Sequence, residues 1–222
     1  MTPQRGWHGY WQNPGDAGFA AKFAWTLPSG VTAGEPQYPV PTTLIIADLM
    51  NYVFEEHYTL LITLNIPAGL APGTVLPVKL RTNYLVCTEE ICVPEAADLS
   101  LDLTVGDGAV TTAMRARFDA FRRAIPKPIG MAAQYQVDGK TVRIGVPYPA
   151  ATALHKAYFF PVTAGFVDYA APQTVTRDGD RLVIETRVIK AGTGPLQGVL
   201  RIGDARGVAI NATPGVVAAA PK

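Results

Sequence analysis

Short segments in which apolar and polar residues alternate recur along most of the chain. They lie at residues 58–65, 78–86, 99–105, 142–146 and 182–188. Successive side chains of a strand point to opposite faces of a sheet, so a period of two predicts half-buried β-strands. The 21 glycines and 19 prolines supply many turns between such segments. This pattern favours an all-β fold of short strands.

Turn-forming residues divide these strands into two groups. Residues 1–45 are rich in Pro, Gly and Asn, and we expect them to be loop-like. Asp138-Gly139 and Asp178-Gly179 are dipeptides that close hairpins. We predict two all-β domains, residues 1–124 and 125–222, each about the size of a β-sandwich. The tail, residues 213–222, is Ala/Val/Pro-rich, and we expect it to be frayed.

One segment has a helical period instead. Met114, Phe118, Phe121 and Ile125 are spaced four, three and four residues apart. Such spacing predicts an amphipathic helix of about three turns, capped by Thr111 or Thr112 and ended by Pro126. Its other positions carry arginines at 115, 117, 122 and 123. These arginines are either a solvated helix face or an anion-binding surface.

Composition excludes several classes of protein. The chain is 48% hydrophobic and 17% charged, which excludes a disordered tail. The formal net charge is +1, without the basic excess of a general nucleic-acid binder. The apolar runs are far shorter than the roughly 20 residues of a membrane span. The first residues lack the apolar core of a signal peptide, so on the residues alone a cytosolic location stays open.

The two cysteines are the strongest local signal for chemistry. Cys87 and Cys92 are separated by only four residues, Thr88-Glu89-Glu90-Ile91. A pair so close together can bridge across a tight turn and reopen, as redox exchange requires. A structural disulfide and metal binding are the other two interpretations. A zinc site needs four Cys or His ligands, and no second ligand pair accompanies the three histidines, so we expect no metal and no cofactor.

Two acidic residues stand inside the cysteine ring. A negative charge near a thiol disfavours the thiolate, which is the attacking species in disulfide exchange. Glu89 and Glu90 are therefore candidates for electrostatic modulation of the pair, or else ordinary solvated carboxylates. No nucleophile elbow, P-loop, zinc-protease motif or dinucleotide fingerprint accompanies them.

Several motifs resemble the N-terminal periplasmic region of a family of bacterial membrane disulfide reductases, the DsbD/ScsB family. The matching segments are residues 10–18 (YWQNPGDAG), 27–30 (LPSG), 34–41 (GEPQYPVP), 84–87 (YLVC), 92–94 (CVP) and 97–101 (ADLSL). Residues 158–161 (YFFP) and 170–173 (AAPQ) look like the second region of the ScsB-type, copper-tolerance branch. The resemblance therefore extends over most of the chain.

The resemblance implies two immunoglobulin-like β-sandwich domains joined by a short helix. It also implies that Cys87 and Cys92 form the redox pair of a protein-disulfide reductase. In such a protein the module takes electrons from a membrane domain and a thioredoxin-like domain, both absent from this sequence. It passes them to thioredoxin-fold periplasmic partners, with Cys92 as the attacking residue. The chain is then a soluble periplasmic fragment of an inner-membrane protein.

The resemblance also implies a cap over the redox pair. Asn51, Tyr52 and Phe54 fall where the family has a loop that shields the disulfide with an aromatic ring. The alternative interpretation is that the rings of Tyr52 and Phe54 are ordinary core residues of a β-sandwich. The rival to the whole assignment is a non-catalytic binding or copper-handling module with a structural disulfide, which a redox titration distinguishes.

Overall fold

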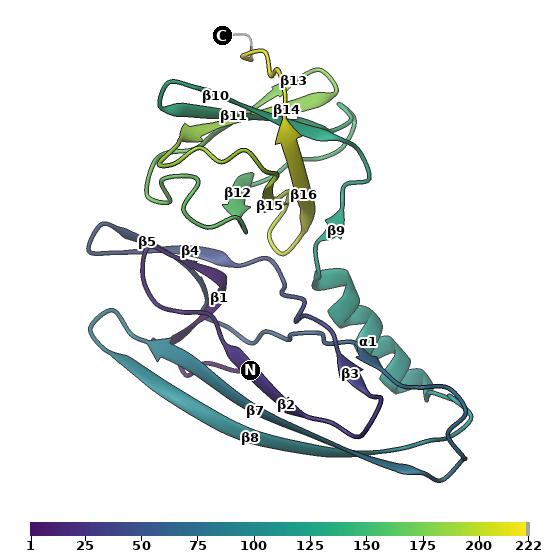
Figure 1. Ribbon diagram of the computed structural model, residues 1–222. Helices are drawn as coiled ribbons and strands as arrows, with labels where there is room; N and C mark the ends of the chain where they lie inside the picture. Colours follow the sequence, from purple (N-terminus) through teal and green to yellow (C-terminus); the bar gives the residue numbers. More distant parts are fainter. Residues whose placement is uncertain (221–222) are drawn as a thin grey trace. The chain divides into compact units, whose positions relative to one another are not determined.

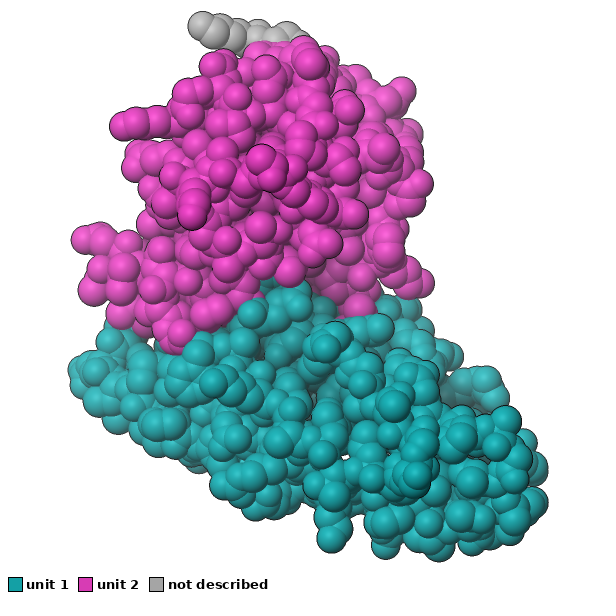
Figure 2. All heavy atoms as spheres, in the orientation of Figure 1, with its two compact units in different colours: residues 1–12, 19–39, 53–124 teal, residues 13–18, 40–52, 125–222 magenta. Residues whose placement is uncertain are grey.

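A computed structural model describes residues 1–220 and shows an all-β protein with one α-helix within them. The fold class predicted from the sequence, immunoglobulin-like β-sandwich architecture with a short helix, is confirmed. Contacts divide the chain into two compact units (Figure 2). Unit 1 holds residues 1–12, 19–39 and 53–124, and unit 2 holds residues 13–18, 40–52 and 125–222. Two short segments before residue 53, residues 13–18 and 40–52, group with unit 2. The division into domains 1–124 and 125–222 stays a prediction.

The first sheet is built around a long hairpin (Figure 1). Its strands run in the order β2-β7-β1-β5-β4, and β8 pairs with β7. Their bounds are β1 His8–Gly15, β2 Lys22–Thr26, β4 Thr42–Ile46, β5 Leu49–Phe54, β7 Val75–Cys87 and β8 Cys92–Thr104. A two-stranded sheet pairs β3 (Thr32–Ala33) with β6 (Leu64–Asn65). The strands predicted at 78–86 and 99–105 are confirmed as parts of β7 and β8, apart from residue 105.

Two predictions for the first 65 residues are wrong. Residues 1–45 contain β1, β2, β3 and all but the last residue of β4, although we expected a loop. Pro14 does not prevent β1, because it lies next to the end of the strand, where the lost N–H matters least. The strand expected at 58–65 is reduced to Leu64–Asn65, with one isolated bridge between Leu61 and Gln37. The alternation of apolar and polar residues there indicates that one face of the segment is buried. A β-strand also needs a neighbouring strand to pair with along its length.

The helix α1 runs from Thr112 to Ala124, as the sequence predicts. The Thr111 hydroxyl accepts a hydrogen bond from the Met114 amide at 3.2 Å, which identifies Thr111 as the cap. Pro126 follows two residues after the helix ends. None of the helix residues is buried.

Unit 2 contains the second large sheet. Its strands run in the order β12-β15-β16-β10-β11-β14-β13, and β9 pairs with β16. Their bounds are β9 Lys127–Pro128, β10 Ala133–Asp138, β11 Thr141–Pro147, β12 Tyr158–Pro161, β13 Thr174–Asp178, β14 Arg181–Arg187, β15 Leu196–Arg201 and β16 Gly207–Pro214. The strands predicted at 142–146 and 182–188 are confirmed as β11 and β14, apart from residue 188. Both hairpins predicted at the Asp-Gly dipeptides are present, with Asp138 opposite Thr141 and Asp178 opposite Arg181.

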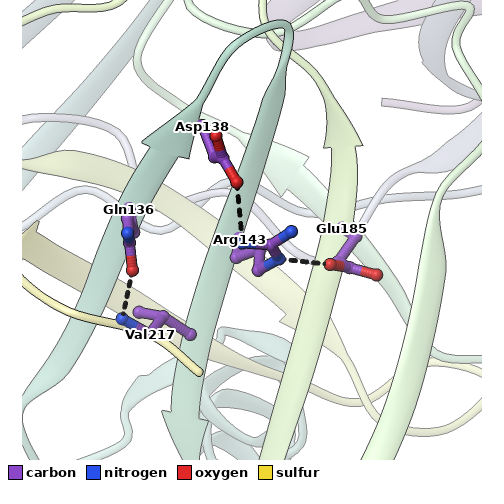
Figure 3. Close-up of polar contacts among 5 residues, drawn as sticks. All are labelled: Gln136, Asp138, Arg143, Glu185 and Val217. Atoms are coloured by element: carbon purple, nitrogen blue, oxygen red, sulfur yellow. Dashed lines mark hydrogen bonds and ion pairs between the residues drawn. The ribbon is translucent and has the colours of Figure 1, made fainter. Parts of the chain in front are cut away.

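Polar contacts fix the middle of this sheet (Figure 3). Arg143 and Glu185 stand directly opposite each other on β11 and β14, and Nε of Arg143 donates to Oε1 of Glu185 at 2.6 Å. The amide of Val217 donates to the Gln136 side chain at 2.8 Å, and Val217 is buried. The tail is therefore fixed to the sheet as far as Val217. The expectation that it is frayed from residue 213 is wrong for residues 213–217. Residues 221–222 of that expectation lie outside the described part.

Candidate functional site

The two cysteines close the β7–β8 hairpin. β7 ends at Cys87, β8 begins at Cys92, and the two residues are register partners. They are joined by a disulfide, with their Cα atoms 4.1 Å apart. This confirms that the pair lies within bonding reach at the end of one strand and the start of the next. The loop between them is held by Thr88, whose hydroxyl accepts hydrogen bonds from the amides of Glu90 and Ile91, each at 3.1 Å.

The two cysteines differ sharply in accessibility. Cys87 is 1% exposed, whereas Cys92 is exposed. The cause is their position in the sheet, because β7 has β1 on one side and β8 on the other, while β8 pairs only with β7 in the described sheet. A large partner can therefore approach Cys92 but not Cys87.

Two residues of β1 lie beside the buried cysteine. His8 is the register partner of Cys87, and Tyr10 follows it on the same face of the sheet. The Tyr10 hydroxyl donates a hydrogen bond to Sγ of Cys87 at 3.2 Å. Nε2 of His8 lies 3.4 Å from the same hydroxyl, and the rings meet edge to face. Because the Tyr10 hydrogen is directed to sulfur, His8 is the donor in its contact with Tyr10.

Burial sets the ionisation of both residues. It raises the pKa of Tyr10, so the hydroxyl keeps its proton and remains a donor. It lowers the pKa of His8, and the nearby charge of Glu55 opposes that change in part. We did not predict either residue from the sequence. The sequence does contain a signal for them, because His8 and Tyr10 are two residues apart and so share one face of a strand. We interpreted residues 1–45 as a loop and therefore did not consider a strand there.

The predicted modulating residues lie in the loop itself. Glu89 and Glu90 are exposed, one and two residues from Thr88, in the turn that carries Cys92. Their position is compatible with an electrostatic effect on the exposed cysteine, and that role stays a prediction.

The predicted cap residues all belong to β5. Tyr52 is fully buried, and its ring packs edge-on against Tyr158, Phe160 and Tyr169 within unit 2. Phe54, in unit 1, stacks on Tyr58 with ring centroids 4.1 Å apart. The Asn51 side chain is buried and donates to the Leu49 carbonyl. Each has a packing role, and their role as a cap stays a prediction.

A pocket of about 370 Å³ lies on the opposite face of the hairpin. Val86 and Val93, the neighbours of the two cysteines, line it together with Trp7, Tyr58 and Tyr84. Alternation along a strand places these side chains away from the sulfur atoms. The pocket therefore does not open onto the disulfide.

Neither a metal cluster nor a membrane-spanning helix is found in the described part of the chain. Residues 1–220 hold no group of three or more His, Cys, Asp or Glu side chains arranged to bind a metal ion. Over the same residues, no helix has the length and apolar character needed to cross a membrane.

A comparison with known families finds a match to the first part of the chain. Residues 1–104 match the family model described as "Thiol:disulfide interchange protein DsbD, N-terminal". The matched segment covers 104 of the 222 residues and includes both cysteines, Tyr10 and the whole β7–β8 hairpin. The part of the chain that carries the site is therefore similar to DsbD N-terminal domains. A DsbD N-terminal domain is a periplasmic thiol-disulfide exchange domain, which supports disulfide oxidoreductase activity in general. No curated protein and no solved structure matches the chain significantly.

Proposed function

We propose that this chain is a thiol-disulfide exchange module that passes reducing equivalents to partner proteins through the Cys87–Cys92 pair. The observation that carries the proposal is the asymmetry of the pair at the hairpin end. One sulfur belongs to an exposed residue of an edge strand, and the other is buried beside a hydrogen-bond donor. Such a pair can present one sulfur to a partner and keep the other for the second step.

The exchange proceeds in two steps from the dithiol. The Cys92 thiolate attacks one sulfur of a partner disulfide, and the partner's other sulfur leaves as a thiolate and takes up a proton. The Cys87 thiolate then attacks Sγ of Cys92 in the mixed disulfide. The partner's remaining sulfur leaves as a second thiolate, and the Cys87–Cys92 disulfide is restored. Two electrons have passed to the partner, and a dithiol donor must return two electrons to the module.

Tyr10 assists at the buried sulfur. When a donor thiolate attacks Cys92 of the oxidised module, Cys87 is the leaving group and gains negative charge. A hydroxyl 3.2 Å away that donates to this sulfur stabilises the developing thiolate. Tyr10 therefore acts directly on a reacting atom, the sulfur of Cys87, although it does not contact the partner.

The finer assignment rests on the sequence motifs and the matched family. We propose that the chain works in the periplasm as a fragment of an inner-membrane reductase of the ScsB type. The donors are its membrane and thioredoxin-like domains, and the partners are thioredoxin-fold proteins, with a link to copper tolerance. We further propose that Phe54 and Tyr52, with Asn51, form a cap and that Glu89 and Glu90 slow unspecific exchange.

Single-cysteine variants test the function. Reduced Cys87→Ser should form a stable mixed disulfide with thioredoxin-fold proteins of a periplasmic extract, because Cys92 attacks and nothing resolves the product. Cys92→Ser should form none and should not reduce partners. Capture by Cys87 alone would reverse the assigned roles.

A redox titration of the unaltered chain separates exchange from a structural bridge. An exchange site should titrate above about −300 mV and equilibrate with glutathione, whereas a structural disulfide lies below that value. A potential below it, together with no mixed disulfide from either variant, would contradict the proposed function. Mass spectrometry after incubation with copper(I) tests the copper-handling alternative.

A further inference from the structure

The helix α1 has an apolar stripe that the protein leaves uncovered. Surface helices normally turn such a stripe to the core. In α1 none of the residues is buried, and Met114 and Phe118 are 43% and 41% exposed. The rings of Phe118 and Phe121 meet edge to face, with centroids 6.0 Å apart. Phe121 is half-buried, so the part of the stripe that faces water is centred on Met114 and Phe118.

Cations border this stripe on both sides. At 100° per residue, Arg115 and Arg122 stand on one side of the apolar stripe and Arg117 on the other. The guanidinium of Arg117 lies 5.7 Å from the Phe121 ring centroid, and that of Arg122 lies 5.7 Å from the Phe118 centroid. The arginines are thus beside the rings and not only on the far face.

Most of these charges are not neutralised within the described residues. Arg122 pairs with Asp119, but Arg115, Arg117 and Arg123 take part in no ion pair among residues 1–220. The helix α1, residues 112–124, carries a net charge of +3, and the rest of the chain carries −2. Positive charge is therefore concentrated on one short element.

We propose that α1 docks on an anionic lipid surface. Its phenylalanines enter the boundary between headgroups and acyl chains, and its arginines contact the phosphates. A basic amphipathic helix with aromatic residues on its apolar stripe has the composition of an interfacial helix. A bilayer needs no shaped groove to receive such a stripe. Nucleic acid fits less well, because its binding depends on phosphate contacts and offers no apolar layer to receive the phenylalanines.

Vesicle co-sedimentation of the whole chain tests the proposal. The chain should bind vesicles that contain phosphatidylglycerol, bind phosphatidylcholine vesicles weakly, and lose binding as salt is added. Arg115→Gln/Arg122→Gln should lower the partition coefficient about thirtyfold, at about 1 kcal/mol per arginine near an anionic surface. Phe118→Ala should lower it roughly tenfold through lost apolar burial.

A matched control separates a local effect from net charge. Arg5→Gln/Arg206→Gln removes the same charge from two exposed arginines outside α1 and should leave binding within about twofold of the unaltered chain. Because no α1 residue is buried, all variants should keep the circular dichroism spectrum and melting temperature of the parent. Equal loss of binding in the control, or no binding to anionic vesicles, would overturn the proposal. Binding to polyglutamate but not to vesicles would assign α1 to an acidic protein and also overturn it.

Discussion

The Tyr10 hydroxyl lies 3.2 Å from Sγ of Cys87 and donates a hydrogen bond to it, although 77 residues separate the two in the chain. The contact exists because β1 pairs with the cysteine end of β7. It gives the buried sulfur a neighbour that can stabilise negative charge, whereas Cys92 is open to partners. The first prediction concerns this contact.

Tyr10→Phe should slow the reduction of the disulfide by dithiothreitol about fivefold. The variant loses one hydrogen bond, worth about 1 kcal/mol, to the leaving Cys87 thiolate. Stopped-flow reduction kinetics measure the effect. Tyr84→Phe is the control, because its hydroxyl donates to Glu95 on the other face of the hairpin. Equal slowing in both variants would show that the Tyr10 hydroxyl has no specific role.

Stability should fall in acid because of His8. Burial lowers its pKa in the folded protein below the ordinary value of 6.5. As the pH falls below 6.5, the unfolded chain binds a proton at this position more readily than the folded chain, so the free energy of unfolding decreases. Above that pH the contribution is fully present. Urea unfolding of the parent and of His8→Gln, from pH 7.5 to pH 5, should show a smaller decrease in the variant. His155→Gln, at an exposed position, is the control for the loss of an imidazole elsewhere in the chain.

Tyr52→Ala should cost about 3–5 kcal/mol of stability, because its fully buried ring contacts three aromatic rings. Its hydroxyl also lies 3.3 Å from that of Tyr158. Phe118→Ala, at an exposed aromatic position, should change stability by less than about 0.5 kcal/mol. Urea unfolding curves measure both values. A cost for Tyr52→Ala as small as that of Phe118→Ala would contradict its core role.

Phe54→Ala is the direct test of the cap. If the ring shields the pair, its removal should speed the reaction of the reduced chain with iodoacetamide several-fold, because steric exclusion is lost. Phe23→Ala, at a half-buried position on β2, is the control for a lost phenylalanine in unit 1. An unchanged alkylation rate with a lowered melting temperature would show that Phe54 only packs against Tyr58.

Glu89→Gln/Glu90→Gln should speed the same alkylation two- to threefold at neutral pH. Removing negative charge beside Cys92 favours its thiolate, but both carboxylates are exposed and salt screens them. Glu35→Gln/Glu56→Gln, also at exposed positions, should leave the rate unchanged. An effect that persists at high salt would exclude a simple electrostatic cause.

Some features were predictable because they depend on local chemistry. The spacing of Met114, Phe118 and Phe121 predicted α1, since the signal lies within one helical segment. The sequence left its cap open between Thr111 and Thr112, and the structure identifies Thr111. The Asp-Gly dipeptides predicted two hairpins, because the backbone of a two-residue turn needs glycine where φ is positive, as at Gly139 and Gly179. Four residues between Cys87 and Cys92 were enough to predict that they could bridge.

The chemistry of the pair depended on neighbours that are distant in the chain. Along β7 the buried side chains change from one face of the strand to the other. Even-numbered positions are buried in the first part, at Leu76, Val78 and Thr82, whereas odd-numbered positions are buried at the cysteine end, at Leu85 and Cys87. The register with β8 is unbroken over the same length. β2 flanks the first part of β7 and β1 flanks its end, so the covered face changes along one strand.

By itself the sequence determined the all-β class, the helix, two hairpin turns and the cysteine pair, because each follows from residues within one short segment. Only the tertiary structure decided that Cys87 is buried, that Cys92 lies on an edge strand, and that Tyr10 donates to the buried sulfur. These relationships depend on which strands become neighbours. Strand pairing joins residues that are far apart in the chain, and a local pattern of alternation does not specify the partner.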